Sequence, residues 1–159
     1  MGTGKTEVGR LLAKALSRRF VDTDAWIEKE NNMTVQKIFA TLGEAAFRQK
    51  EAEALAVLCG QKGLVLATGG GIILNPQNVV LLRETGFVIW LDAGLEELAR
   101  RLAGDNTRPL LAGGVDFRDI YRRREKLYRN AAHVRIDTTG KTPLVVSDEI
   151  QALLRQDGA

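Results

Sequence analysis

Residues 1–24 read MGTGKTEVGRLLAKALSRRFVDTD, and this stretch decides the fold. Its first six residues are the second part of a phosphate-binding loop, in which a glycine and four further residues precede Gly-Lys-Ser/Thr. In such loops the backbone amides and the helix N-terminus surround phosphate oxygens, the lysine neutralises the β and γ phosphates, and the hydroxyl binds Mg²⁺. We therefore expect a nucleotide to be bound by Gly2, Thr3, Gly4, Lys5 and Thr6.

The rest of the chain alternates helix and strand patterns. Apolar residues at helical spacing follow the loop over 8–16, and a short strand over 20–24 ends in Asp22 and Asp24, which would share one face. Further strands are predicted over 64–67, 87–91 and 134–137, and helices over 35–42, 44–58, 76–85, 95–103, 117–131 and from 143 onward. This order predicts an α/β fold with a parallel sheet flanked by helices.

Length and composition exclude several classes of protein. A chain of 159 residues makes one domain of roughly 150 residues, and 45% apolar with 27% charged residues is ordinary globular composition. A net charge of +3 does not argue for a nucleic-acid partner, and the apolar runs are far below the roughly 18 residues that span a membrane. With a single cysteine and no secretory leader pattern, we expect a cytoplasmic monomer without nucleic-acid or membrane partners.

Several polar residues stand where chemistry could occur. Carboxylates at the end of a strand can serve a metal and an attacking hydroxyl, and Gly69–Gly71 would let backbone amides approach a ligand. Arg48 lies one turn before Glu51, a spacing that also suits a plain exposed ion pair. The arginines crowded between 100 and 135 indicate either a local anion site or a solvated helix face.

At these residues the sequence resembles the shikimate kinase family. The resemblance covers essentially the whole chain, and each motif occurs in the family's order and approximate spacing. Besides Gly-Lys-Thr, the motifs are Asp22-Thr23-Asp24, Phe47-Arg48 with Glu51, Gly69-Gly70-Gly71, Arg108-Pro109-Leu110-Leu111, and Arg124 before Leu127-Tyr128. The resemblance implies a phosphate-loop nucleoside-monophosphate-kinase-like fold. It also implies transfer of the γ-phosphoryl group of ATP to the 3-hydroxyl of shikimate, within chorismate and aromatic amino-acid biosynthesis.

The resemblance also implies a role for each matching residue. Lys5 and Thr6 would serve phosphate and Mg²⁺, Asp22 would hold the metal through water, and Arg101 would pack against adenine. Shikimate would be bound by Asp24, Arg48, Gly69, Gly70, Gly71 and Arg124, with the two arginines on its carboxylate and Asp24 accepting a proton. The catalytic groups would be Lys5, Asp24 and Arg108, the last carried by a lid over about 104–116. A helical pair over about 25–60 would bind the substrate.

The sequence leaves two alternatives and one structural expectation. The alternatives are another small-metabolite kinase, such as gluconate kinase, and a nucleotide-binding module made inactive by a truncated loop. In a sheet of the family's kind, the strand that feeds the phosphate loop lies between the strand ending at Thr68 and the one ending at Leu91. We expect about ten further residues before Met1 in the natural protein, and a gap in the sheet formed by 1–159 alone.

Overall fold

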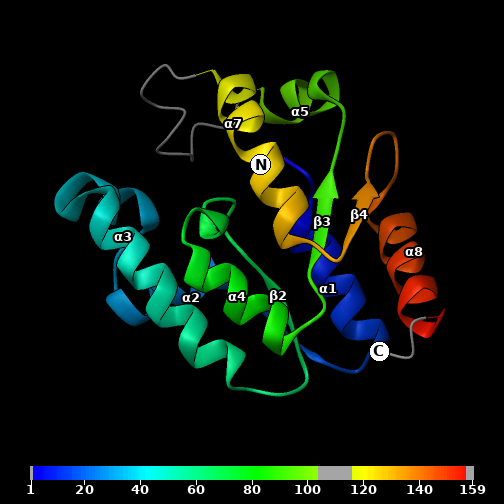
Figure 1. The fold of residues 1–159 in the computed structure, drawn as a ribbon, viewed down its shortest axis with the longest axis horizontal. Coiled ribbons are helices and arrows are strands. Elements are labelled where there is room, and N and C mark those ends of the chain that lie inside the picture. Colours follow the sequence, from blue (N-terminus) through cyan, green and yellow to red (C-terminus); the bar gives the residue numbers. More distant parts are fainter. Residues whose placement is uncertain (1, 104–115, 157–159) are drawn as a thin grey trace.

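The computed structural model describes residues 2–103 and 116–156 (Figure 1). Its strands are β1 (Arg19–Asp22), β2 (Leu64–Ala67), β3 (Ile89–Asp92) and β4 (Val134–Asp137). Its helices are α1 (Lys5–Ala15), α2 (Thr23–Asn31), α3 (Val35–Cys59), α4 (Pro76–Thr85), α5 (Leu95–Leu102), α7 (Phe117–Ala131) and α8 (Pro143–Gln156), with a 3-10 turn η1 (Ile72–Leu74). The predicted α/β class is confirmed.

The strands form two parallel pairs. β1 pairs with β2, so that Asp22 lies opposite Ala67, and β3 pairs with β4, so that Asp92 lies opposite Asp137. Among the described residues no backbone pairing joins β2 to β3, which is the gap that the sequence predicts. A cavity of about 610 Å³ is lined by both of these strands together with α1 and α8.

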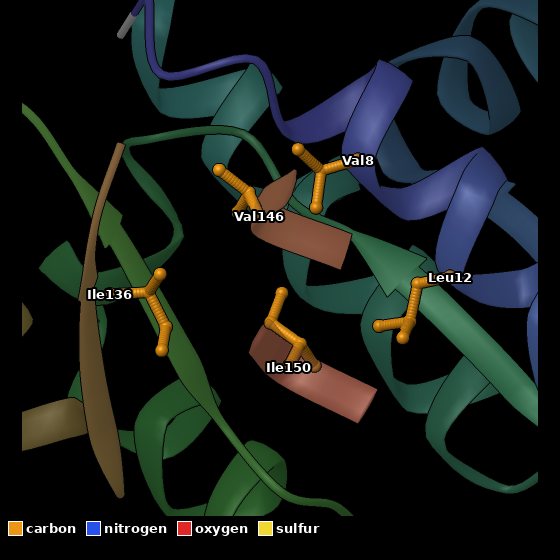
Figure 2. Packing of buried hydrophobic residues seen from close by; sticks show 5 residues of the cluster. All are labelled: Val8, Leu12, Ile136, Val146 and Ile150. Carbon is orange, nitrogen blue, oxygen red and sulfur yellow. The ribbon is translucent and has the colours of Figure 1, made fainter. Parts of the chain in front are cut away.

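The largest apolar cluster links the two strand pairs. Its buried members are Val8, Leu12, Ile136, Val146 and Ile150, from α1, β4 and α8, and their side chains converge in Figure 2. Partly buried Val65 of β2 and Leu91 of β3 pack against the same cluster. The amphipathic α1 and α8 therefore hold together two strand pairs that are not joined by backbone pairing within the described ranges.

The helices α2 and α3, which follow β1, lie at one end of the long axis (Figure 1). α3 is broken at Gly43, whose φ of 82° and ψ of 170° are not helical, as the sequence predicts for the boundary between two helices. The Thr34 hydroxyl caps the first part by accepting from the Lys37 amide at 3.2 Å. Ile27, Ile38 and Phe47 are buried between α2 and α3.

The expected strand over 20–24 is wrong at its end, because β1 stops at Asp22 and Asp24 lies in the first turn of α2. The Asp22 carboxylate accepts from the amides of Asp24, at 3.0 Å, and Ala25, at 3.4 Å. This N-cap stabilises a helix directly after the strand, and the sequence interpretation missed that helix. The two aspartates therefore do not share a strand face.

Two expectations remain, one for the lid over about 104–116 and one for membrane-spanning helices. Arg108 and the lid over about 104–116 lie outside the described residues, apart from Asp116, which accepts from the Arg118 amide at 2.9 Å and caps α7. In the described ranges, every helix is too short or too polar to span a bilayer.

Candidate functional site

The phosphate loop ends in a helix N-terminus that no side chain caps. Gly4, with φ of 77° and ψ of 22°, is the residue before α1, a left-handed conformation that favours glycine. Lys5 and Thr6 are the first residues of the helix. Backbone amides at such an end, with a lysine beside them, suit an anionic ligand. The described part of the loop therefore has the form that nucleotide binding requires.

Thr6 and Asp22 lie together at the carboxyl end of β1. The Thr6 hydroxyl donates to Asp22 Oδ2 at 3.0 Å. These two oxygen donors fit Mg²⁺, which takes one or two protein oxygens and completes its shell with water and phosphate oxygens. The described ranges contain no cluster of three or more His, Cys, Asp or Glu that could hold a metal. The structure thus brings together both residues that were predicted as magnesium ligands.

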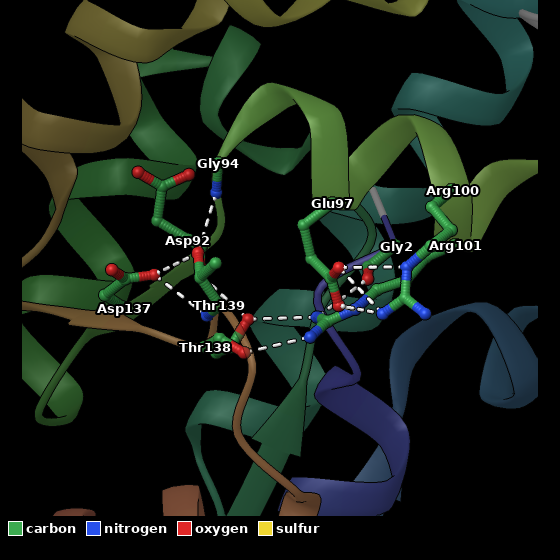
Figure 3. Close-up of polar contacts among 9 residues, drawn as sticks. All are labelled: Gly2, Asp92, Gly94, Glu97, Arg100, Arg101, Asp137, Thr138 and Thr139. Carbon is green, nitrogen blue, oxygen red and sulfur yellow. Dashed lines mark hydrogen bonds and ion pairs between the residues drawn. The ribbon is translucent and has the colours of Figure 1, made fainter.

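Arg101 lies beside the loop and is held by protein partners (Figure 3). Its guanidinium donates to Thr138 Oγ1 at 3.0 Å, to the Thr138 carbonyl at 2.9 Å and to the Gly2 carbonyl at 3.4 Å. It also donates to Glu97, one turn earlier on α5, at 2.8 Å. A hollow of about 310 Å³ is lined by Gly2–Gly4, Arg101 and Thr138. The loop, Arg101 and the segment after Asp137 therefore form one wall.

The segment after β4 is fixed by short polar contacts. Asp137 accepts from the Thr139 amide at 2.9 Å and from its hydroxyl at 2.6 Å, and these hydrogen bonds lower the pKa of Asp137. The Thr139 hydroxyl in turn accepts from the Gly94 amide at 2.9 Å (Figure 3). These contacts hold the turn after β4 against the start of α5.

The three glycines after β2 are approached by side chains from three other elements. A Cβ at Gly69 would lie 2.8 Å from Asp24 Oδ1 of α2, and one at Gly71 would overlap the Arg48 guanidinium of α3. A Cβ at Gly70 would lie 3.0 Å from the Tyr128 hydroxyl of α7. A Cβ at any of the three positions would displace one of these side chains, so the predicted substrate groups converge on Gly69–Gly71.

Arg124 is the buried member of a basic helix. Its side chain is 8% exposed, and its Nη1 donates to the Gly70 carbonyl at 3.2 Å. Arg122 and Arg129 on the same helix are 69% and 67% exposed. The interpretation of a solvated arginine face therefore holds for these two exposed residues of α7 and fails for Arg124, which is turned toward the triple glycine.

Arg48 belongs to a buried ion pair rather than the exposed one that its spacing allows. It pairs with Glu44 at 2.8 Å and with Glu51, whose side chain is 1% exposed. Burial raises the pKa of Glu51, the charge of Asp24 adds to this, and Arg48 opposes it. Burial lowers the pKa of Arg48, but its hydrogen bonds to Glu51 and Glu44 outweigh this and raise it. Arg48 therefore keeps its charge at the site.

Some residues of the site were not assigned a role from the sequence. The Thr23 hydroxyl accepts from the Gly69 amide at 3.2 Å, and the Tyr128 hydroxyl donates to the Gly70 carbonyl at 2.6 Å. Burial raises the pKa of Tyr128, which keeps its hydroxyl protonated as a donor. No spacing rule identifies either contact, because each joins residues more than forty positions apart. His133 has a structural contact, since its Nδ1 accepts from the Val88 amide at 2.9 Å.

Comparison with known proteins shows which family this chain is similar to. The family described as shikimate kinase matches residues 1–155. The chain belongs to this family. The shikimate kinase of Symbiobacterium thermophilum is 46% identical over 163 residues, covering 99% of this chain and 94% of the relative. That of Persephonella marina is 41% identical over 156 residues, covering 98% and 94%.

Solved structures of shikimate kinases agree with this membership. The enzyme from Acinetobacter baumannii in complex with shikimate superposes with a TM-score of 0.93 at 38% identity, covering 99% of this chain and 89% of that one. The enzyme from Aquifex aeolicus gives a TM-score of 0.84 at 29% identity, covering 99% and 93%. The predicted fold, the ATP- and Mg²⁺-dependent phosphotransferase activity and shikimate as acceptor are confirmed by membership of the family. Gluconate kinase activity is not favoured.

Proposed function

We propose that the protein binds shikimate at the triple glycine and ATP at the loop of residues 2–6. The transfer moves the γ-phosphoryl group of ATP to the 3-hydroxyl of shikimate and yields shikimate 3-phosphate. The observation that carries this assignment is the convergence of Asp24, Arg48 and Arg124 on Gly69–Gly71 from three helices. Two cations and a carboxylate at one point match an acid that carries several hydroxyls.

On the acceptor side, the charges of the site are complementary to shikimate. Arg48 and Arg124 bind its carboxylate, because a planar guanidinium pairs with a carboxylate through two parallel hydrogen bonds. Asp24 accepts hydrogen bonds from the ring hydroxyls and takes the proton of the attacking one. The amides of Gly70 and Gly71 contact the ring from the opposite side. The helical pair over about 25–60 supplies Arg48 and is the substrate-binding part of a single domain.

On the donor side, the helix N-terminus and Lys5 bind the phosphates, and Arg101 packs against adenine. Thr6 and Asp22 would hold Mg²⁺, Asp22 through water. When bound, Mg²⁺ neutralises phosphate charge and orients the phosphoryl group. Phosphoryl transfer is catalysed by positioning and charge stabilisation, so the protein needs no covalent nucleophile.

Arg108 completes the charge around the phosphates in this proposal, carried by a lid over about 104–116. Because Arg108 would act on the transition state, Arg108→Ala should lower kcat more than it raises the KM for shikimate. An unchanged kcat would refute this role. We further propose that the protein acts in the cytoplasm as a monomer. The molecular mass in solution, measured by light scattering, tests the oligomeric state.

The function is tested by a single-turnover assay with ATP, Mg²⁺ and shikimate, in which release of ADP is measured. We expect release with shikimate and only background release with gluconate. Nucleotide binding without turnover would instead support an inactive module. A matched pair of variants tests the nucleotide wall. Arg101→Ala should raise the KM for ATP by about threefold to tenfold, while Arg129→Ala, an exposed arginine of α7 outside the lining of the hollow beside the loop, should leave it unchanged.

A further inference from the structure

The carboxylate of Asp92, the last residue of β3, is buried and is not among the groups proposed to contact a ligand. Asp92 is 1% exposed, and its carboxylate has donors on two other elements. It accepts from the Tyr121 hydroxyl of α7 at 3.1 and 3.2 Å, and from Arg135 Nε of β4 at 2.8 Å. The Arg135 guanidinium also lies 5.2 Å from the Trp90 ring centroid. A charge taken out of water in this way is retained only when its partners are fixed.

The Tyr121 contact fixes the helix that carries the acceptor-side arginine. Arg124 and Tyr128 lie three and seven positions after Tyr121 on α7, so the three side chains lie on one face of this helix. Tyr121 contacts Asp92, whereas Arg124 and Tyr128 both donate to the Gly70 carbonyl. Tyr128 also stacks on Trp90 with ring centroids 5.9 Å apart. Asp92 thus holds α7 near its start and Gly70 holds it further along, while Arg83 donates to the carbonyls of Asn130 and Ala131 at its end.

The main chain of the same aspartate reaches the nucleotide side. The Asp92 carbonyl accepts from the Thr138 amide at 2.7 Å and from the Thr138 hydroxyl at 2.8 Å. Thr138 is the residue that accepts two hydrogen bonds from Arg101. In Figure 3 the Asp92 carboxylate points away from the Arg101–Glu97 pair. Asp92 therefore contacts α7 with its side chain and the nucleotide wall with its backbone.

We propose that Asp92 and Tyr121 are positioning residues for shikimate binding: the hydrogen bond from Tyr121 to Asp92 fixes α7 so that Arg124 lies at Gly70. This inference rests on the proposed role of Arg124. Neither residue is within hydrogen-bond distance of Arg48 or Gly69–Gly71 among the contacts of the described chain, so both act through α7. The side chain of Asp92 serves the acceptor side, and the nucleotide side depends on its backbone.

Tyr121→Phe tests the proposal because it removes one hydroxyl and keeps the ring. We expect the dissociation constant and the KM for shikimate to rise by about fivefold to tenfold, with kcat, the KM for ATP and the melting temperature nearly unchanged. Arg122→Ala is the matched control, since Arg122 lies next in the same helix, is exposed, and contacts Asp119 rather than Asp92. It should leave all these quantities unchanged.

Asp92→Asn is the second variant, because it keeps the backbone contacts to Thr138 and an acceptor for Tyr121 but loses the charge. Shikimate binding should again weaken while ATP binding is retained, and the double variant should be no weaker than the weaker single one. An unchanged shikimate dissociation constant in Tyr121→Phe, or an equal loss of both ligands, would overturn the proposal.

Arg124→Ala separates failure of this inference from failure of the proposed site. If Arg124→Ala weakens shikimate binding and Tyr121→Phe does not, the positioning role is wrong and the carboxylate contact stands. If neither variant affects binding measured by calorimetry, the assignment of Arg124 is wrong and the positioning role falls with it.

Discussion

The two strand pairs carry two differently built halves of the site. Beside β1 and β2, charged groups of α2, α3 and α7 meet at Gly69–Gly71, and Glu51 and Arg124 among them are buried. Beside β3 and β4, Arg101 is held by Glu97 of its own helix and by Thr138, next to a helix N-terminus. The acceptor half therefore depends on desolvated charges, whereas the donor half depends on a helix N-terminus and on the hydrogen bonds of a partly exposed arginine.

The largest effect is expected where the charge is buried. Arg124→Ala should weaken shikimate binding by about 2 to 5 kcal/mol, because it removes one partner of a desolvated charge pair, and leave ATP affinity nearly intact. Calorimetric titration with each ligand measures this. Arg48→Ala should have the same effect as Arg124→Ala. An equal loss of affinity for shikimate and for ATP would contradict the distinction between the acceptor half and the donor half.

The cavity between the strand pairs offers a second test. An apolar strand of about five residues, followed by a glycine and one further residue and joined ahead of residue 1, should raise the free energy of unfolding by about 2 to 4 kcal/mol. The added strand would fill the space lined by β2 and β3 and pair with their edges. Urea denaturation measures the gain. A Gly/Ser extension of the same length is the control, and equal stability of the two extended chains would contradict the prediction.

Substitution of a predicted metal ligand should have a smaller effect. Asp22→Asn should raise the Mg²⁺ concentration for half-maximal activity by about tenfold, since the charge is lost while the side chain can still cap α2. Thr6→Ser retains the hydroxyl that contacts Asp22 and should stay close to the parent protein. A Mg²⁺ titration unaffected by Asp22→Asn would remove this residue from the donor half.

The smallest effect is expected from ionisation of Tyr121. Burial, followed by the charge of Asp92, raises its pKa from 10.0 to about 12. The folded state binds the proton more tightly, so the resulting stability is fully present below pH 10 and is lost as the pH rises through about 12. Between these values the parent protein should lose more stability than Tyr121→Phe in chemical denaturation. Identical pH profiles would show that the contact to Asp92 is not maintained in solution.

Local patterns were sufficient for most elements of the fold. α7 spans the predicted 117–131, and the break in α3 falls at Gly43, because capping residues and glycines act within a few residues of themselves. The same locality explains why the loop of residues 2–6 was recognised as a phosphate site. The prediction failed at 20–24, where the side chain of Asp22 ends a strand and begins a helix.

The order of helices and strands and the phosphate loop could be predicted from the sequence, and the set of acceptor-side residues from the family resemblance. Only the tertiary structure decided which charges are buried. Arg124 and Arg122 are both arginines on α7, yet one lies against Gly70 and the other in solvent. Burial depends on which elements pack together. The spacing of Arg48 and Glu51 permits their ion pair, but its burial, like the contact of Tyr121 with Asp92, follows from long-range packing that no local pattern encodes.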